Sequence, residues 1–327
     1  MNHALTNIPS IRHNHPTFWR DLANGTYLKL APRIAVHRDH YHGLSLSSQL
    51  RLRAIAAARS AYTAVLISKS AARVHGLWVL DSTEEKVEMA LPHNSLPNKH
   101  RRHPERVYRK TKLPDPLLVH GARTVSPARA VIDIARFHGF REGLVAADSA
   151  LRTGITKKKL RQEFARMGRI RNSAVVREVI HHSCAASPSP YASFARALLI
   201  QAGFPWPMFF EVQYAALPGI TAELCINKTY IIDIAEPDDK HTAGSSSTAI
   251  GPATTIEPPG EVTATTMPTK PRDQVDHSRD KRLRDAGFTV IRISPHQLVQ
   301  HPERFISEVI ATISARQNAV RAQRSRL

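Results

Sequence analysis

Cysteines are scarce in this sequence of 327 residues, which holds only Cys184 and Cys225. The two are far apart and lack the CxxC spacing of zinc sites, which argues against a disulfide framework and a cysteine-bound metal. No apolar run approaches the roughly 20 residues that cross a bilayer, and the first residues lack the apolar middle of a signal peptide. We therefore expect a cytoplasmic protein that does not enter a membrane.

Acidic residues are also few, because 27 Asp and Glu stand against 46 Lys and Arg, which gives a net charge of +19 and a pI near 10.5. Such an excess attracts polyanions over long distances, and DNA is the polyanion that we expect. The alternatives are a solvated basic face and anionic lipid, but no basic amphipathic helix carries aromatic anchors. The positive charge gathers in residues 51–59, 99–112, 156–171 and 321–327.

The N-terminal residues predict a helix followed by a hairpin. Residues 16–23 have helical character, Asn24 and Gly25 form a break, and residues 26–39 alternate around a turn at Pro32. Helix then hairpin is typical of a winged helix, and the segment resembles the N-terminal part of AbiEi-like antitoxins of type IV toxin–antitoxin systems. Residues 33–35 stand where that wing carries its glycine and aromatic, so we expect a reduced wing that contacts DNA weakly or only packs.

A second segment, SKSAARVHGL, predicts a short helix with Ser68 as its N-cap and Gly76 just past its end. Residues 70–72 and 75–77 resemble the S-A-A and H-G-L parts of a signature of the same AbiEi-like family. His75 has two interpretations: a packed histidine near the negative end of the helix, which we favour, or a catalytic histidine.

Three strands are predicted next, over residues 86–91, 106–112 and 117–120, with a basic loop between the first two. We expect this lobe to contact phosphates through Arg101, Arg102, Arg106, Arg109 and Lys110.

The following stretch, TVSPARAVIDIARF, places Ser126 at an N-cap and Pro127 at the first helical position. It resembles the T-S-P-x-R-x-x-x-D helix of the AbiEi-like family. Arg129 and Asp133 lie four residues apart on one face of this helix, so we assign them to a stabilising pair.

Two carboxylates interrupt the apolar alternation of residues 221–236. With a three-residue turn, Ile226 pairs with Tyr230, and Glu223 then faces Asp233 across two antiparallel strands. A two-residue turn would place the two on opposite faces. Facing carboxylates repel each other unless they are exposed, protonated or bridged by a cation, so we hypothesise a site for Mg²⁺ or Mn²⁺ with Glu223 and Asp233 as ligands.

The C-terminal order of helix, strand, carboxylate hairpin, basic helix and strand resembles the very-short-patch-repair-like restriction-endonuclease fold. The closing helix and strand match it at Arg279, Asp280, Leu283, Ala286, Gly287, Phe288, Val290 and Arg292. In that family a helix glutamate and two hairpin acids form the active site. Glu223 and Asp233 occupy the hairpin positions, but Ala192 replaces the helix glutamate, and the aspartate, glycine and lysine expected near the second acid are missing.

Together these patterns predict a multidomain α+β or α/β protein. The segment 242–276 is rich in Ser, Thr, Pro and Gly and cannot bury enough apolar surface to order itself. The predicted parts are a reduced winged-helix-like and helical region (1–85), an α+β middle lobe (86–182), an α/β restriction-endonuclease-like lobe (187–241 and 277–315), a disordered insertion (242–276) and a basic tail (316–327).

We expect a DNA-binding regulator or antitoxin-like protein whose endonuclease-like domain is inactive and which needs no cofactor. The enzymatic alternative is a Mg²⁺- or Mn²⁺-dependent DNA endonuclease in which Glu223 and Asp233 are catalytic and hold the ion, while Arg279 or Arg292 steadies the scissile phosphate. A third alternative is an antitoxin that neutralises a cognate toxin protein by direct contact.

Overall fold

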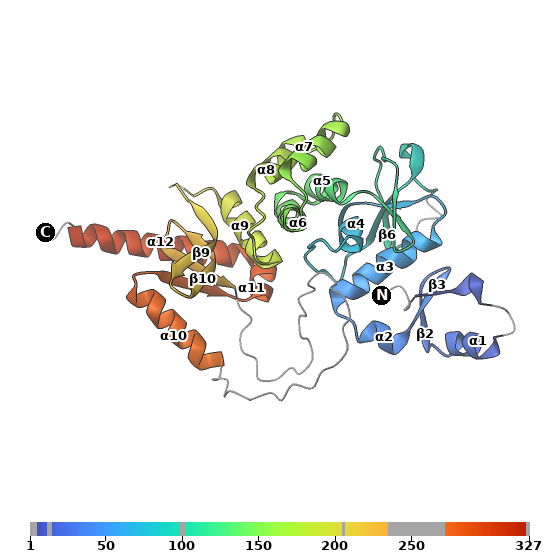
Figure 1. The fold of residues 1–327 in the computed structure, drawn as a ribbon, viewed down its shortest axis with the longest axis horizontal. Helices are drawn as coiled ribbons and strands as arrows, with labels where there is room; N and C mark the ends of the chain where they lie inside the picture. The colour runs from blue at the N-terminus through green and yellow to red at the C-terminus, as the bar shows by residue number, and fades with distance from the viewer. Residues whose placement is uncertain (1–4, 12–14, 99–102, 205–206, 235–271, 325–327) are drawn as a thin grey trace, which may run out of the picture. The chain divides into compact units, whose positions relative to one another are not determined.

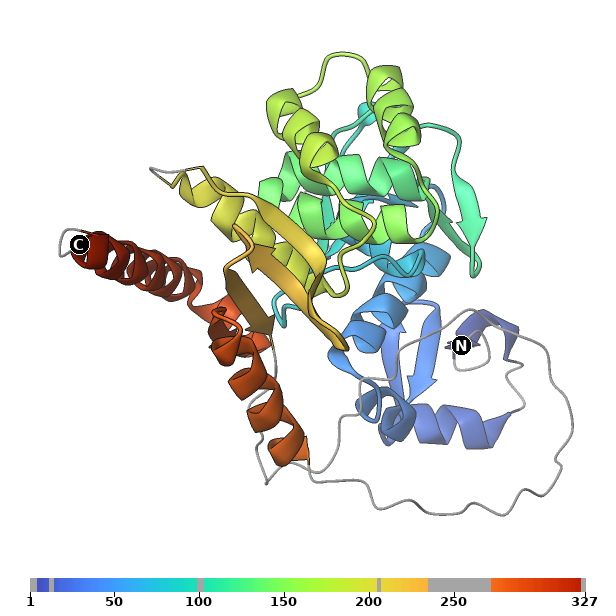
Figure 2. The same ribbon diagram turned by 60° about the vertical axis from the view of Figure 1, so that its left-hand side comes forward.

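The computed structural model describes residues 5–11, 15–98, 103–204, 207–234 and 272–324. It is a mixed α/β structure with three sheets in the described part of the chain (Figures 1 and 2). The chain divides into two compact units, one ending at Pro207 and the other beginning at Met208. No helix among the described residues is both long and apolar enough to cross a membrane.

The first unit opens with a small antiparallel sheet in the order β1-β3-β2. Its elements are β1 (Leu5–Asn7), α1 (Pro16–Ala23), β2 (Tyr27–Ala31), β3 (Ile34–His37) and α2 (Arg38–His42). The predicted helix and hairpin are therefore confirmed. Gly25 makes the intervening turn with φ of +83°, and its carbonyl accepts a hydrogen bond from Nε of Arg38 at 2.6 Å.

A five-stranded sheet in the order β6-β5-β4-β8-β7 forms the centre of the first unit. Its elements and neighbours are α3 (Leu46–Ser60), β4 (Val65–Leu66), α4 (Ser68–Val74), β5 (Val87–Ala90), β6 (Arg106–Tyr108), β7 (Leu117–Val119) and β8 (Ala122–Thr124). The three predicted strands are present and shorter than expected. Alanines let α3 and α4 pack closely on this sheet, since Ala56, Ala71 and Ala72 are fully buried.

The start of α4 differs from the prediction, because the N-cap is Ile67 and not Ser68. Ser68 is the first helical residue, is buried, and has a φ of +52°, a conformation that costs a residue with a Cβ about 1–3 kcal/mol. The Ser70 hydroxyl accepts a hydrogen bond from the Glu88 amide at 2.9 Å, which ties α4 to β5. Gly76 follows the helix with φ of +75°, as predicted.

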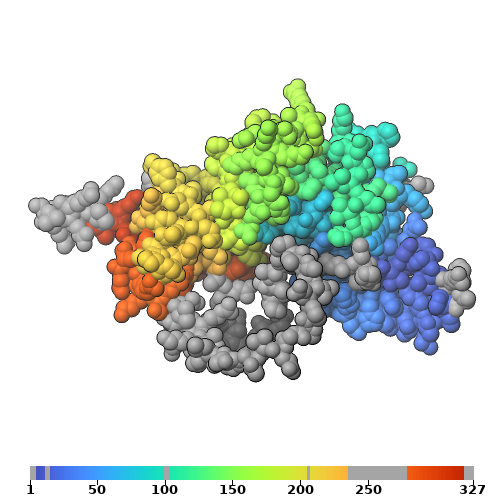
Figure 3. Space-filling view, in the orientation of Figure 1, coloured from blue at the N-terminus to red at the C-terminus, as the bar shows by residue number. Residues whose placement is uncertain are grey.

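Five helices complete the first unit: α5 (Pro127–His138), α6 (Phe140–Arg152), α7 (Lys157–Arg166), α8 (Ser173–His182) and α9 (Pro190–Ala202). The Ser126 hydroxyl caps α5 as predicted, by accepting from the Arg129 amide at 3.2 Å. Helices α5 and α6 approach so closely at Gly143 that a Cβ there would lie 2.8 Å from Cα of Ala135. In the space-filling view, α7 and α8 form the green upper part of this unit (Figure 3).

Helix α9 belongs to the first unit, whereas the sequence resemblance placed it at the start of the C-terminal lobe. The buried carboxylate of Asp148 in α6 holds it there, because Arg196 Nη2 donates to Oδ2 at 2.6 Å and the Ser193 hydroxyl donates at 2.7 Å. The Cys184 amide donates to the other oxygen of the same carboxylate at 2.7 Å. Ala192 is fully buried in this helix.

The second unit contains a four-stranded sheet in the order β12-β11-β10-β9. Its elements are β9 (Phe210–Leu217), β10 (Ile220–Ile226), β11 (Tyr230–Ile234), α10 (Arg272–Asp285), β12 (Thr289–Ile293), α11 (Pro295–Gln300) and α12 (Pro302–Arg324). Strands β11 and β12 are parallel and the other pairs are antiparallel. Leu283 of α10 is fully buried against Ala222 and Ile231 of the sheet.

Two predicted boundaries shift in this unit. Helix α10 begins at Arg272, inside the range 242–276 that was expected to be a disordered insertion, and the rest of that range lies outside the described residues. Helix α12 continues to Arg324, so the predicted tail 316–327 is helical over most of its length.

We predict that Asp148→Ala lowers the free energy of unfolding of the first unit by about 3–5 kcal/mol, because it leaves the buried Arg196 guanidinium without its carboxylate. Glu84→Ala, at an exposed position of the same unit, is the control and should change stability little. Chemical denaturation followed by circular dichroism measures both, and equal stability of the two variants would contradict the role given to Asp148.

Candidate functional site

The acidic hairpin has the register that the sequence predicts. Strands β10 and β11 pair Ile226 with Tyr230 and continue to Leu224 with Ile232, so the next pair is Glu223 with Asp233. The three-residue turn between them places Asn227 at φ of +51° and Lys228 at +53°. The two carboxylates therefore lie on one face of the sheet, as predicted.

Two arginines contact the carboxylate of Asp233. Arg279 Nη1 of α10 donates to Oδ2 at 2.9 Å, and Nε of Arg292 lies 3.5 Å from the same oxygen. Arg292 also binds Asp280 through Nη2 at 3.0 Å. Both arginines, which we expected to steady a phosphate, are thus engaged with carboxylates of their own unit, and the cation beside the acidic pair is a guanidinium.

Glu223 lies in a different environment from Asp233. Burial and then the negative charge of Asp233 raise the pKa of the Glu223 carboxyl, and Arg279 opposes this only in part. Its Oε2 atom is buried without a hydrogen-bond partner among the described residues. Within the described ranges no group of three His, Cys, Asp or Glu side chains is arranged to hold a metal ion. A divalent cation at this site would therefore have only the carboxylates of Glu223 and Asp233 as acidic ligands, and Asp233 is already paired with Arg279 and Arg292.

The predicted phosphate-contacting residues of the first unit have different surroundings. Arg101 and Arg102 lie outside the described residues. Arg106 lies in β6 opposite Val87. Arg109 is held inward: its Nη2 donates to buried Glu88 at 3.1 Å, and its guanidinium lies 4.8 Å from the centre of the Phe137 ring.

Glu88 is able to hold Arg109 because its carboxyl is stabilised in the charged form. Burial opposes the charge, but a hydrogen bond from His138 Nε2 at 2.9 Å and the charge of Arg109 outweigh it, so the pKa of Glu88 is lowered. Arg109, itself only partly buried, therefore pairs with the buried carboxylate of Glu88, whereas the neighbouring Lys110 is exposed.

His75 has a structural contact of its own. Its Nε2 lies 2.7 Å from the carbonyl oxygen of Val125, which ties α4 to the connection between β8 and α5. Burial is the main cause that lowers the pKa of its imidazole, so the ring is neutral near pH 7 and donates this hydrogen bond. The packed interpretation of this histidine agrees with the contact.

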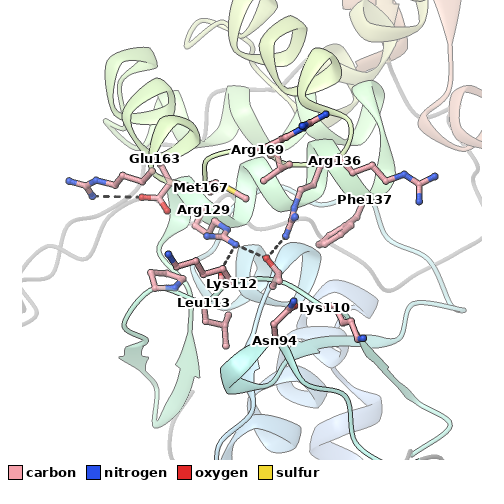
Figure 4. A pocket seen from close by; sticks show the side chains of 15 residues that line it. Asn94, Lys110, Lys112, Leu113, Arg129, Arg136, Phe137, Glu163, Met167 and Arg169 are labelled. Carbon is pink, nitrogen blue, oxygen red and sulfur yellow. Dashed lines mark hydrogen bonds and ion pairs between the residues drawn. The ribbon is translucent and has the colours of Figure 1, made fainter.

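A basic cavity of about 470 Å³ lies in the first unit between residues 110–114, helix α5 and the end of α7 (Figure 4). We call it the basic cavity. Seven cationic residues line it, and Glu163 is the one acidic residue that the structure places in its lining. The cationic residues are Lys110, Lys112, Arg129, Arg136, Arg166, Arg169 and Arg171.

Two arginines at the base of the cavity are fixed by buried partners. Asp133, which is fully buried, accepts from Nε of Arg129 at 3.2 Å and from Nε of Arg136 at 2.8 Å. The Thr111 hydroxyl accepts from Nη2 of both arginines, at 2.8 and 2.7 Å. Figure 4 shows both guanidinium groups reaching down from α5, with Lys110 and Asn94 opposite them.

The predicted pair of Arg129 and Asp133 is thus confirmed, and it has a third member in Arg136. Nη1 of each arginine makes no hydrogen bond to any residue that the structure describes, so each keeps donors for a ligand. Fixed guanidinium groups bind phosphate or carboxylate at low entropic cost, because their own geometry is already set.

Of the cationic residues of this cavity, Lys110 alone was predicted to contact phosphate, and Arg129 was assigned to a structural pair with Asp133. The signal was present, since residues 99–112 and 156–171 are two of the basic segments, and the fold brings residues 110–112 and 166–171 together around one concavity. The spacing of Asp133 and Arg136, three residues apart on one helix, also predicts a contact.

Comparison with known proteins adds no assignment. No protein-family model matches the chain, and no curated protein sequence matches it.

We predict that the raised pKa of Glu223 makes the second unit less stable as the pH rises. The folded state binds the proton more tightly than the unfolded state, so stability is full below the ordinary glutamate pKa of 4.5 and falls as the pH rises through the higher folded value. The isosteric variant Glu223→Gln removes this loss.

The free energies of unfolding of the wild type and of Glu223→Gln, measured by chemical denaturation at several pH values from 4 to 8, check this expectation. Glu223→Gln should gain stability over the wild type with increasing pH. Glu211→Gln is the control, since this glutamate of β9 is half-exposed and pairs loosely with Lys228 at 3.9 Å. A constant difference between wild type and Glu223→Gln would contradict the raised pKa.

Proposed function

We propose that this protein is a DNA-binding regulator or antitoxin-like protein in which the endonuclease-like unit does not cleave. The observation that carries the proposal is the convergence of residues 110–112 and 166–171, from two separate basic segments, around one cavity. Arg166, Arg169 and Arg171 are exposed, as are Lys110 and Lys112. A concave surface with this charge attracts a phosphate backbone more strongly than scattered lysines do.

The arrangement of the elements supports the finer fold assignments that belong to this proposal. A helix followed by the β2–β3 hairpin is the order of a winged helix, with β1 as the third strand of its sheet. In the second unit, a basic helix connects the carboxylate hairpin to a parallel strand, which is the order of the very-short-patch-repair-like fold.

The state of the acidic hairpin supports the absence of cleavage. A metal-dependent nuclease needs carboxylates that are free to ligate the ion, and an ion that can activate water beside the scissile phosphate. Here Arg279 and Arg292 neutralise Asp233, and the raised pKa of Glu223 favours its uncharged form. Guanidinium groups in the place of the ion stabilise the hairpin without activating water.

Binding of duplex DNA tests the proposal. Wild-type affinity should fall steeply with salt. In Arg169→Ala/Arg171→Ala the negative slope of log K against log salt should become shallower by about 2, because each lost phosphate contact removes about 0.9 from its magnitude. Fluorescence anisotropy over a series of salt concentrations gives the slope.

The matched control is Lys86→Ala/Arg177→Ala, which removes the same charge from exposed positions of the same unit outside the cavity lining. It should leave the slope nearly unchanged. Salt-insensitive binding by the wild type, or equal slopes for the two double variants, would contradict the proposed interface.

Incubation of supercoiled plasmid with the wild type and either Mg²⁺ or Mn²⁺ should leave the plasmid intact. Nicking that disappears in Glu223→Ala/Asp233→Ala would contradict an inactive unit and establish the hairpin as a nuclease site. Nicking that persists in this double variant would show that Glu223 and Asp233 are not the site of the activity.

A further inference from the structure

The geometry points to a nucleoside-phosphate site in the first unit, with the phosphate in the basic cavity and the base in a second cavity beside it, against Tyr62. This proposal goes beyond duplex binding, because its ligand is a single nucleotide or the end of a strand and it uses a second cavity as well as the basic one.

The second cavity, of about 790 Å³, shares part of its wall with the basic cavity. The shared residues are Asn94, Lys112, Leu113 and Pro114. We call the second one the aromatic cavity, because the remaining lining includes Tyr62 together with Val65, Pro92 and Pro116. A cationic cavity and a more apolar one with a common wall match a ligand that joins a phosphate to a flat, weakly polar group.

Tyr62 provides the surface for that flat group. At 82%, Tyr62 has the highest exposed fraction among the large hydrophobic residues that the structure describes. Arg123 fixes the backbone beneath it by donating through Nη2 to the carbonyl oxygens of both Ala61 and Tyr62. The Arg33 guanidinium lies 5.7 Å from the ring centre. An exposed aromatic ring on a fixed backbone, with an arginine nearby, is a platform on which a base stacks.

Asn94 of the shared wall has a φ of +55°, and its neighbour His93, which lines only the aromatic cavity, has a φ of +58°, so both lie in the left-handed region. Neither is glycine, so the backbone there holds a strained conformation of the kind that clusters at ligand-binding segments. Asn94 lines both cavities, and its side-chain amide offers a donor and an acceptor between the phosphate and the base.

On the phosphate side, the fixed guanidinium groups of Arg129 and Arg136 have the donors described above, and Lys112 adds a mobile ammonium at the shared wall. The lining acid Glu163 is already compensated by Arg166 at 3.9 Å. The surplus of positive charge favours a phosphate dianion over a single carboxylate. The same chemistry is offered by a free nucleotide and by the 5′-phosphorylated end of a nucleic acid strand.

Isothermal titration calorimetry on the full-length protein tests the site with defined probes. The four deoxynucleoside 5′-monophosphates, the corresponding nucleosides and inorganic phosphate are titrated separately. At least one monophosphate should bind at least tenfold more tightly than both its nucleoside and inorganic phosphate. Equal affinity of inorganic phosphate and all four monophosphates would overturn the role of the aromatic cavity, and absence of binding by all probes would overturn the site.

Single-stranded oligonucleotides with a 5′-phosphate or a 5′-hydroxyl distinguish the two sources of the ligand. If the 5′-phosphorylated strand binds more tightly than both the 5′-hydroxyl strand and the free monophosphate, the site is assigned to strand ends. Equal binding of both strands together with tight binding of the monophosphate assigns it to free nucleotides.

Substitutions at exposed positions keep the test independent of folding. Tyr62→Ala should weaken the preferred monophosphate about tenfold while Tyr62→Phe retains the wild-type affinity, because stacking needs the ring and not the hydroxyl. Lys112→Ala should also weaken it about tenfold, and Lys86→Ala should not. Unchanged affinity in Tyr62→Ala would overturn the site even where duplex DNA binds normally, so the outcome is separable from that of the proposed function.

Discussion

Pairing of arginine with buried carboxylate is the interaction on which this structure depends. Asp133, Asp148 and Glu88 in the first unit are buried, and each holds at least one arginine. In a chain with a net charge of +19, each buried carboxylate binds at least one of the many guanidinium groups. Removal of Asp133 or Asp148 would leave a buried positive charge, which costs far more than the pair contributes to stability.

The same interaction has two different results in the two units. Around Asp133, the arginines are anchored through Nε and Nη2, and their Nη1 groups are left for a ligand in the basic cavity. Around Asp233, Arg279 and Arg292 both contact the same carboxylate oxygen. The outcome depends on where the carboxylate lies. Asp133 is buried and orients Arg129 and Arg136 toward the basic cavity, whereas the carboxylate of Asp233 is itself occupied by the contacts with Arg279 and Arg292.

Local structure could be predicted from the sequence wherever local chemistry determines it. The register of Glu223 and Asp233 follows from turn length and apolar alternation, and the capping of α5 follows from Ser126 and Pro127. Ser68 was assigned wrongly as an N-cap: α4 has Ile67 at its N-cap, and its first turn binds Glu88 of β5 through the Lys69 amide and the Ser70 hydroxyl, which are tertiary contacts that the capping pattern does not show.

Contacts between distant segments could not be predicted in this way. Nothing in residues 272–285 indicates that Arg279 reaches Asp233, since 46 positions separate them along the chain. The basic cavity illustrates the same limit: composition identified both basic segments, while only the packing of α5 and α7 shows which cations share a concavity. Attachment of α9 to α6 through Asp148 likewise depends on tertiary contacts and overrides the family resemblance.

The two cysteines differ in burial, and this difference allows one of them to be labelled selectively. Burial is the main cause that raises the pKa of the Cys225 thiol to about 11, so this thiol stays protonated and unreactive near neutral pH. Cys184 is only partly buried, and its amide binds the carboxylate of Asp148 that fixes α9. A thiol-reactive fluorophore would therefore label Cys184 selectively in the folded protein, and its signal would follow the release of α9 from α6 without any engineered cysteine.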